Sequence, residues 1–214
     1  MTEKISFCFV HKNRLEWNIG NETLPLFKNC LLTLKNCIES LDIKEYEICI
    51  SSWDEKEDYQ NLESFLYSNF DTEKVKVQNF VQEEFSRGKG RNRSFQLSTG
   101  HFIFFFDADM IFLRDKVLKD GLESLKNNKA YFPICYSFYE DGTADWRPYG
   151  YGNCGVKREM MDNIDWLDKK TWGKEDDKFF ADLKSKYSVL RKNTEGFCHQ
   201  WHPSMAPQDR GWKK

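Results

Sequence analysis

Apolar residues in the first half of the chain follow two alternating patterns. Short continuous or alternating runs predict buried strands at 5–10, 46–52, 75–80 and 102–106. Between these runs, helical segments are predicted from spacings of three or four residues at 24–41 and 59–70, and over the later part of 85–99. We expect Asn21 or Thr23 to cap the first helix and Gly100 to end the third. This strand–helix alternation predicts an α/β fold with a mostly parallel, doubly wound sheet.

The second half of the chain is less regular. Asp115 is expected to cap a helix that ends at 127–128, and a strand over 130–138 leads into a hairpin turn at 140–142. The segment 149–155, rich in glycine and tyrosine, is predicted to be a loop ahead of a short helix around Met160. A helix after Glu175 and a short strand over 187–190 complete the pattern.

The predicted topology places several charged side chains together. In a parallel sheet with right-handed crossovers, the loops that follow the strands meet at one edge, where ligands bind. The residues expected to face this crevice are Lys12, Arg14, Asp54, Arg87, Asp107 and Asp109. Cations suit phosphates and paired acids suit a divalent metal, so the crevice predicts a ligand that carries a nucleotide.

Composition narrows the class of protein. The chain has 214 residues with 18 Phe, enough for a substantial core, and its 32 basic and 34 acidic side chains give a net charge of −2. This balance gives no electrostatic case for nucleic acid as a partner. The seven Cys form no CxxC pair, and the four in apolar patterns (Cys8, Cys30, Cys37 and Cys49) are expected to be buried thiols in a reducing compartment. No secretory signal and no apolar run of 18 residues are found, so we expect a single cytoplasmic domain, 1–214.

Asp107 and Asp109 directly follow the apolar strand 102–106. Carboxylates at the end of a buried strand must be solvated, paired or bound to a metal, because burying them alone is too costly. Their oxygens suit Mg²⁺ or Mn²⁺. On this segment alone, an acidic turn after a strand is an equally good interpretation.

Two further clusters in the second half carry chemistry. Glu175, Asp176 and Asp177 begin a helix, where acids are favoured by the helix dipole alone, but the preceding Trp172-Gly173 pair offers a platform for a ligand and allows a general base there. His199 and His202 flank a tryptophan, and imidazole nitrogens are good ligands for Mn²⁺ or Zn²⁺. In the segment 85–93, glycines among four cations suggest close backbone approach to phosphate or carboxylate.

Taken together, these segments resemble a family. The segment 106–110 (Phe-Asp-Ala-Asp-Met) resembles the DxD motif of GT-A glycosyltransferases, and 85–92 resembles their Phe-Asn-Arg segment. The segment 172–177 (Trp-Gly-Lys-Glu-Asp-Asp) is similar to the Trp-Gly-Gly-Glu-Asp motif of β-1,4-galactosyltransferases and chondroitin-synthase-type N-acetylgalactosaminyltransferases. The segment 199–203 is similar to the His-x-x-His of the chondroitin-type members. Four motifs in the family's order span nearly the whole chain.

The resemblance implies a GT-A fold, with a Rossmann-like, mostly parallel sheet flanked by helices and a smaller mixed region on the acceptor side. The half 1–113 would bind the nucleotide sugar, and the half 114–214 would bind the acceptor and carry catalysis. It implies an inverting, metal-dependent transfer of a hexose or N-acetylhexosamine from a UDP-sugar to a glycan hydroxyl, as in polysaccharide biosynthesis. Association with a membrane-bound acceptor would be peripheral.

The same resemblance implies roles for single residues. Asp109 and His202 would hold Mn²⁺ (or Mg²⁺), with His199 as a further ligand, and Asp107 would lie by the donor ribose and diphosphate. Asp176 would be the catalytic base and Glu175 its neighbour at the donor sugar. The residues implied around the UDP-sugar are Lys12, Arg14, Asp54, Phe85, Arg87 and Trp172.

Two positions depart from the family's pattern: Lys174 stands where a glycine is usual, and Lys12 stands in place of an arginine.

Two other functions remain open at this point. One is a non-catalytic binder of nucleotide sugars on the same fold. The other is a phosphohydrolase of the haloacid-dehalogenase type, which also has Asp-x-Asp after a strand, although normally near the start of the chain.

Overall fold

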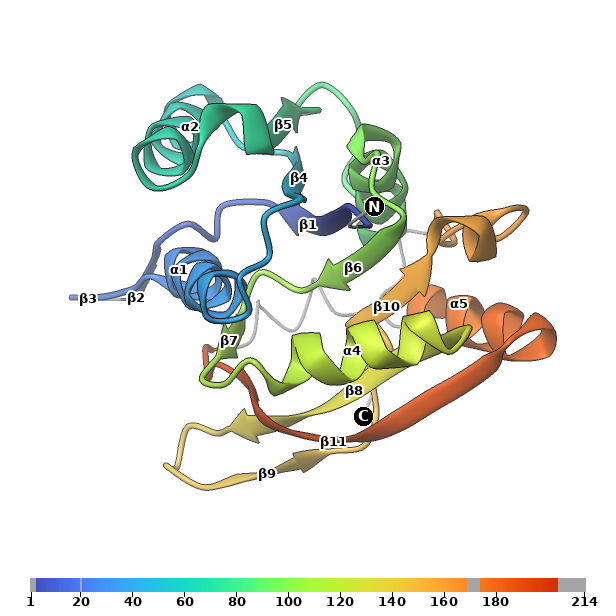
Figure 1. Ribbon diagram of the computed structural model, residues 1–214. Helices are drawn as coiled ribbons and strands as arrows, with labels where there is room; N and C mark the ends of the chain where they lie inside the picture. Colours follow the sequence, from blue (N-terminus) through green and yellow to red (C-terminus); the bar gives the residue numbers. More distant parts are fainter. Residues whose placement is uncertain (1–2, 20, 169–173, 204–214) are drawn as a thin grey trace.

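The computed structural model describes residues 3–19, 21–168 and 174–203. A mixed sheet of nine strands runs through this part of the chain in the order β5-β4-β1-β6-β10-β8-β11-β7, with β9 paired to β8 (Figure 1). A separate two-stranded sheet consists of β2 (Trp17–Ile19) and β3 (Glu22–Leu24). An α/β fold was therefore predicted correctly, while this small hairpin was not predicted.

The first half forms the parallel part of the sheet. β1 (Ile5–His11) lies between β4 (Tyr46–Ser52) and β6 (Phe102–Phe106), and β5 (Val75–Asn79) pairs with β4, all in parallel register. The connecting helices are α1 (Leu26–Ser40), α2 (Lys56–Asn69) and α3 (Arg87–Leu97). Each predicted element of this half is present. Most of them combine a clear apolar period with a length that suits their type, whereas α3 is mostly polar and buries two glycines, Arg91 and Ser94.

The second half contains the antiparallel part, and here the predictions are less complete. β8 (Lys129–Phe138) forms the predicted hairpin with β9 (Ala144–Arg147), whose turn includes Gly142 at a φ of 79°. β10 (Cys154–Lys157) inserts antiparallel between β6 and β8, where the glycine-rich segment had predicted only a loop. The 3-10 helix η2 (Arg158–Met161) follows it.

The last strand is longer than predicted. β11 (Ser188–His199) pairs parallel with β8 and antiparallel with β7 (Met110–Phe112). Its middle is polar and partly exposed, so the apolar period that predicts strands is missing beyond Leu190. A bulge between Asn193 and Cys198 restores the pairing before the strand reaches His199.

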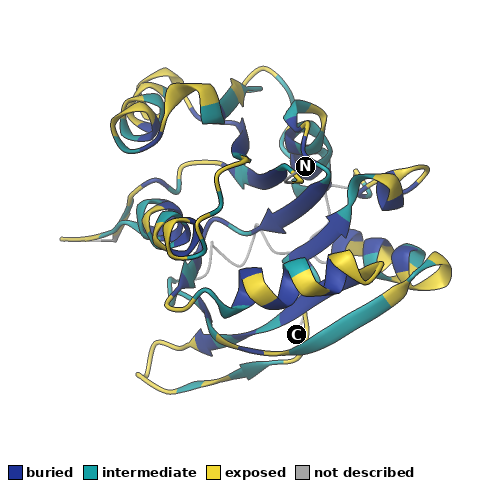
Figure 2. Ribbon diagram, in the orientation of Figure 1, coloured by how far each residue is buried: buried dark blue, intermediate teal, exposed yellow. Residues whose placement is uncertain are grey.

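Helices cover both faces of the sheet. α1, α2 and α4 (Lys116–Lys126) pack on one face, and α3 with α5 (Lys174–Lys186) packs on the other. Figure 2 shows the buried strands between these two helical layers. Along β6 the side chains alternate between the layers, since Phe104 and Phe106 belong to one core and Ile103 and Phe105 to the other.

Two predicted helix boundaries are wrong. The N-cap of α1 is Pro25, without a side-chain cap bond, and Thr23 instead lies in β3 and donates to Asn18. Gly100 does not end α3, whose C-cap is Ser98. Gly100 is needed for close packing, because a Cβ there would lie 2.5 Å from the Ser6 hydroxyl. Asp115 does precede α4 as its N-cap, although its side chain makes no cap bond.

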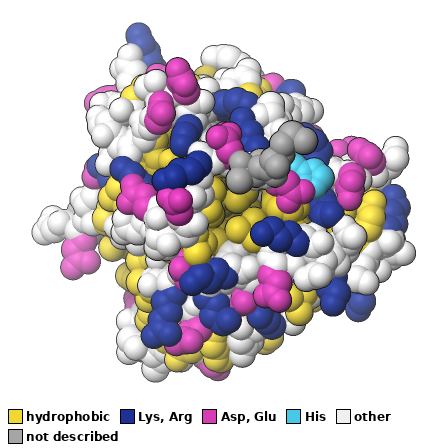
Figure 3. Space-filling view, in the orientation of Figure 1, with side chains coloured by type: hydrophobic (Ala, Val, Ile, Leu, Met, Phe, Trp, Pro, Cys, Tyr) yellow, Lys and Arg dark blue, Asp and Glu magenta, His cyan; other side chains and the backbone are white. Residues whose placement is uncertain are grey.

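On the face formed by α1 and α4, the charged side chains do not gather into a patch of one sign (Figure 3). Acidic and basic side chains are interspersed there around a strip of hydrophobic side chains (Figure 3). All seven cysteines are buried thiols, which includes the four whose burial was predicted. Within the described ranges, each helix is too short or too polar to cross a bilayer.

A buried carboxylate ties three strands together near the start of the sheet. Glu47 of β4 is 1% exposed and accepts from the Ser6 hydroxyl at 2.7 Å, while Lys4 and Lys76 lie 2.7 and 2.8 Å from its other oxygen. Burial by itself raises the pKa of Glu47, but the two lysines, Ser6 and the Thr99 amide outweigh it and hold the pKa below its ordinary value.

We expect Glu47→Gln to lower the free energy of unfolding at pH 7 by roughly 1–3 kcal/mol, because two lysines lose their buried counter-charge. Since the folded-state pKa of Glu47 is depressed, its stabilisation is present above the unfolded value of about 4.3 and is lost as the pH falls toward the folded value. Urea titrations at pH 7 and pH 3.5 should show the gap between the variant and the parent narrowing at low pH.

The matched control is Glu195→Gln, because Glu195 is exposed and paired only with exposed Arg114. It should change stability by less than about 0.5 kcal/mol at both pH values. Equal losses in the two variants would contradict the assigned role of Glu47.

Candidate active site

Asp109, which follows β6, lies close to His199 and His202 near the end of the described chain. Asp109 Oδ2 lies 3.1 Å from His202 Nε2, and Asp109 Oδ1 lies 3.9 Å from His199 Nε2. One ligand atom from each of the three residues falls within 4.8 Å of the others. β11 supplies His199 by pairing with β7, where His199 stands opposite Met110. The sheet therefore joins two segments about ninety residues apart in sequence.

The electrostatics of this cluster favour an ionised Asp109 and a neutral His199. Burial raises the pKa of Asp109, but the hydrogen bond from His202 and the charge of Arg14 outweigh it and hold the pKa well below its usual value. Burial lowers the pKa of His199. A carboxylate and uncharged imidazole nitrogens are the protonation states that ligate a divalent metal.

The loop after β1 brings two cations to this edge of the sheet. Arg14 donates from Nη1 to Asp109 Oδ2 at 2.5 Å, and the Lys12 ammonium lies 5.0 Å from the centre of the Phe85 ring. Asn13 between them has a φ of 50°, in the left-handed region that Asn tolerates. The crevice predicted from topology therefore contains these residues.

Asp54 reaches the same loop from the end of β4, but it is 0% exposed. Its Oδ2 lies 2.6 Å from His11 Nδ1 and accepts from the Ser52 hydroxyl, and its Oδ1 accepts from the Asn13 amide at 2.6 Å. Burial raises the pKa of Asp54, but His11 and the other donors outweigh this and lower it. Asp54 thus holds the loop backbone through Oδ1, while its Oδ2 binds the side chains of His11 and Ser52.

Asp107 is surrounded by donors. Its Oδ1 accepts from Arg91 at 2.8 Å and from Arg87 at 3.3 Å, and its Oδ2 accepts from the Asn153 amide at 3.2 Å. The backbone amide of Asp107 donates to Asn153 Oδ1 at 2.8 Å, which fixes the residue from both sides. Burial raises the pKa of Asp107, and Arg91 and Arg87 overcome this and lower it.

Arg91 links this acid to the second half of the site. It is 3% exposed, its Nη1 donates to Asp176 Oδ1, and its guanidinium lies 4.3 Å from the centre of the Trp166 ring. Asp176 and Glu175 are both buried in the first turn of α5. Glu175 lies 3.8 Å from Arg87. One buried arginine therefore holds the carboxylates from β6 and α5 in a fixed relation.

Gly152 leaves the space that this arrangement needs. A Cβ on Gly152 would lie 2.2 Å from Arg91 Nη2 and 3.1 Å from Asp176 Oδ2, so any larger residue would displace the pair. Gly90 is required for a similar reason, because a Cβ there would meet the side chain of Val10.

Sequence reasoning missed three residues of this site. Arg91 stands in the cationic segment that was singled out, but four cations in one segment gave no means of choosing among them. Asn153 and Gly152 lie in the segment predicted to be a loop, and only the pairing of β10 brings them to β6.

Trp172 lies outside the described residues. Lys174, the departure from the family pattern, is exposed.

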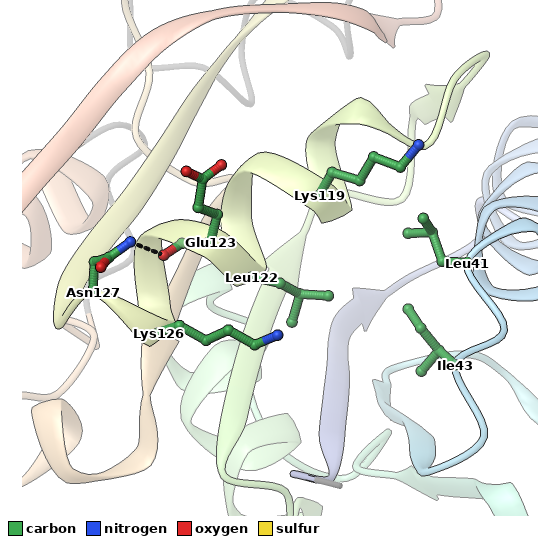
Figure 4. A pocket seen from close by; sticks show the side chains of 7 residues that line it. All are labelled: Leu41, Ile43, Lys119, Leu122, Glu123, Lys126 and Asn127. Carbon is green, nitrogen blue, oxygen red and sulfur yellow. Dashed lines mark hydrogen bonds between the residues drawn. The ribbon is translucent and has the colours of Figure 1, made fainter.

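A separate surface groove of about 390 Å³ lies between the end of α1 and α4. Figure 4 shows Leu122 facing Leu41 and Ile43, with Lys119 and Lys126 extending from α4 beside them. The groove shares no residue with the acid and histidine cluster. Its lining offers apolar contact and a few charges, and it holds no group of metal ligands.

Arg91→Met should lower the free energy of unfolding by about 3–5 kcal/mol, because it leaves the buried carboxylate of Asp176 without its counter-charge. The double variant Arg91→Met/Asp176→Asn should recover part of that loss. Arg93→Met on the same helix is the control, since Arg93 pairs with Glu83 near the surface and should cost less than about 1 kcal/mol. Chemical unfolding of the parent, the variants above and Asp176→Asn alone measures the coupling free energy between Arg91 and Asp176. If the effects of the two single substitutions simply add in the double variant, the two residues are not coupled.

Comparison with known proteins agrees with this architecture. Chondroitin sulfate N-acetylgalactosaminyltransferase 1 of Mus musculus is 27% identical over 175 residues, which cover 69% of this chain and 33% of that protein. Chondroitin sulfate synthase 3 of Homo sapiens is 27% identical over 146 residues, covering 58% of this chain and 16% of that protein. The chain thus spans a third or less of the length of these relatives.

Solved structures share the fold. TarS 1–349 of S. aureus in complex with UDP-GlcNAc matches with a TM-score of 0.73 at 12% identity, over 94% of this chain and 60% of that chain. The mannosyltransferase PcManGT from Pyrobaculum calidifontis in complex with GDP-Man and Mn²⁺ matches with a TM-score of 0.67 at 10% identity, over 93% and 56%. The model of glycosyl transferase family 2 matches residues 25–187. The chain therefore belongs to glycosyl transferase family 2 and has the GT-A fold.

Proposed function

We propose that the protein is an inverting, divalent-metal-dependent glycosyltransferase that moves a hexose or N-acetylhexosamine from a UDP-sugar to a hydroxyl of a glycan. The observation that carries this proposal is the cluster of Asp109, His199 and His202 beside two carboxylates, Asp107 and Asp176, that share Arg91. This arrangement would place metal ligands, a donor site with Asp107 held in position, and a candidate base together at one edge of the sheet.

The donor set fits Mn²⁺ or Mg²⁺. One carboxylate oxygen and two imidazole nitrogens converge, and His199 Nδ1 is buried without a hydrogen-bond partner among the described residues. Imidazole among the ligands favours Mn²⁺ over Mg²⁺. A bound divalent metal would supply Lewis-acid stabilisation of the leaving diphosphate. One structural neighbour was solved in complex with GDP-Man and Mn²⁺ and another in complex with UDP-GlcNAc, which supports the general class of ligand.

The donor is proposed to bind against the β1 loop and the start of α3. Lys12 and Arg14 supply positive charge for phosphate, while Phe85 offers an aromatic face and Arg87 with Asp107 a polar edge for ribose and sugar. Trp172 remains assigned to this pocket by resemblance. Because Asp54 is fully buried, we assign it to the shape of the loop, where sequence resemblance had implied contact with the base.

Asp176 is proposed to deprotonate the acceptor hydroxyl, and Glu175 to lie at the donor sugar. Arg91 donates to both Asp176 and Asp107, so the proposed base is held at a fixed position relative to the donor site. The hydroxyl oxygen forms a bond to the anomeric carbon as the bond to UDP breaks. The proton goes to Asp176, and a single displacement inverts the configuration.

We further propose that residues 1–214 form one domain, in which 1–113 binds the donor and 114–214 binds the acceptor and carries catalysis. Its partners are a nucleotide sugar and a glycan. A cytoplasmic location rests on the seven buried thiols, which suit a reducing compartment. Peripheral association with a membrane-bound acceptor belongs to the same proposal.

Asp109→Asn should weaken Mn²⁺ binding on the order of 100-fold, and His202→Ala on the order of 10-fold or more, because each removes a ligand from the cluster. Electron paramagnetic resonance of free Mn²⁺ during titration measures this directly. Asp58→Asn, at an exposed position of α2, is the control and should bind like the parent. Unchanged binding in the Asp109 variant would exclude this cluster as the metal site.

Asp176→Asn should lower kcat for transfer by about 10²–10⁴-fold and leave the dissociation constant of UDP within a few-fold, because the base acts on the acceptor. The control is Asp177→Asn, the exposed neighbour in the same helical turn, which should keep the parent rate. UDP release from UDP-galactose, UDP-glucose and their N-acetylated forms, with Mn²⁺ and with EDTA, gives both the donor and the metal dependence.

The alternatives give different results in the same assay. Metal-dependent UDP binding without turnover on any donor would favour a nucleotide-sugar binder. Phosphate release from a phosphoester without a sugar nucleotide would favour a phosphohydrolase.

A further inference from the structure

Gln200 lies between the two histidines of the candidate metal site and has both ends of its side-chain amide in hydrogen bonds. Its Nε2 donates to the backbone carbonyls of Leu26 at 2.9 Å and Met110 at 3.1 Å. Its Oε1 accepts from Asn29 Nδ2 at 2.9 Å, and its backbone amide donates to the Asp109 carbonyl at 2.9 Å. One residue therefore joins the end of the described chain to the start of α1 and to the segment that carries Asp109.

The two carbonyls determine which way round the side-chain amide of Gln200 lies. A carbonyl oxygen only accepts hydrogen bonds, so the NH₂ group of Gln200 must face Leu26 and Met110. Its oxygen then faces Asn29, whose side-chain NH₂ group is the matching donor. Position 200 therefore uses two donors and an acceptor together at the end of a long side chain, which is the chemistry of glutamine.

The partners of Gln200 are themselves held in place. Asn29 stands in α1, and its backbone carbonyl accepts from the Thr33 hydroxyl at 2.6 Å. The same hydroxyl oxygen accepts from the backbone amide of Phe112 in β7 at 3.1 Å. The side chain of Gln200 therefore contacts a helix and a strand that are already bonded to one another, and such a support is rigid.

His202 depends on this support more than His199 does. His199 ends β11 and pairs with Met110, so the sheet fixes its backbone. His202 lies beyond the strand, and among the described residues the amide of Gln200 makes the last backbone hydrogen bond between this end of the chain and the rest of the fold. The ring of Trp17 lies 5.1 Å from the ring of His202, which restricts the imidazole but not the backbone that carries it. The backbone that leads to His202 is thus fixed to the fold through Gln200.

We propose that Gln200 is a positioning residue for the metal site, because its amide sets the place from which His202 reaches Asp109. The inference rests on the proposed function, since it assumes that this cluster binds a divalent ion. Gln200 itself supplies no ligand, because both polar atoms of its side chain are already bonded within the fold. Groups that orient metal ligands typically change metal affinity by about 10–100-fold when they are replaced.

The first measurement is the affinity for Mn²⁺ without nucleotide, from electron paramagnetic resonance of free Mn²⁺ at pH 7. Gln200→Met keeps the length of the side chain but neither donates nor accepts in the same way, so it should weaken binding about 10–100-fold. Asn29→Ala leaves the end of the chain unchanged and removes one partner of Gln200, so it should weaken binding by a few-fold. Gln60→Ala, at an exposed position of α2, is the control and should bind like the parent.

A double-mutant cycle separates positioning from a general loss of structure. In a His202→Ala background, Gln200→Met should weaken Mn²⁺ binding by less than about twofold more, because the ligand that Gln200 positions is already absent. A general structural role would give the same factor with and without His202. The visible absorption of bound Co²⁺ adds a spectroscopic readout, since the spectrum of Gln200→Met should shift toward that of His202→Ala. Circular dichroism confirms that each variant is folded.

The outcomes separate the positioning role from the proposed function. Equal Mn²⁺ affinity in the parent, Gln200→Met and Asn29→Ala would overturn the positioning role and leave the metal site in place, and so would an equal loss in Gln200→Met with and without His202. If Asp109→Asn and His202→Ala both bind Mn²⁺ like the parent, the metal site and the positioning role fail together. If the cycle behaves as expected but no UDP-sugar is turned over, the positioning role stands and the proposed transfer fails.

Discussion

The arrangement of the site depends on one buried cation. Arg91 reaches from α3 between Asp107 and Asp176, which belong to opposite halves of the chain. Without it, both carboxylates would lose the counter-charge that they share, which is costly for buried acids. With it, both acids are held at fixed positions and the halves are joined through an ion pair as well as through the sheet. The tight glycines at 90 and 152 are the steric counterpart of this constraint, because they let the helix and the loop approach their neighbours closely.

Most of the parallel half could be predicted because its central strands are apolar runs and α1 and α2 keep a regular apolar period. The strand Phe102–Phe106, for example, follows directly from five consecutive apolar residues. β10 could not be predicted in the same way. Its four residues follow a run of glycines and tyrosines. They form a strand because they pair with β6 on one side and β8 on the other, and this pairing depends on how distant parts of the chain come together.

For the site, the sequence identified residue types with distinctive chemistry and left out those that organise them. Asp109 was recognisable because an acid at the end of a buried strand needs a partner, and the two histidines because closely spaced imidazoles are good metal ligands. Arg91 and Asn153 were missed because arginine and asparagine are common on surfaces, and only their burial beside Asp107 sets them apart. The burial of Asp54 was also beyond the reach of sequence, since an acid after a strand is more often exposed.

The pairing of β11 with β7 has a consequence for how the protein is made. The residues that gather around Asp109 come from a loop near position 14, from position 109 and from positions 199 and 202. Since synthesis proceeds from the N-terminus, the nascent chain carries the aspartate and the arginine long before either histidine emerges. The three-residue cluster is therefore complete only when almost the entire described chain has been released. Until then, the acid has only Arg14 as a partner from this cluster, so a partly made chain lacks the two imidazoles that complete the ligand set.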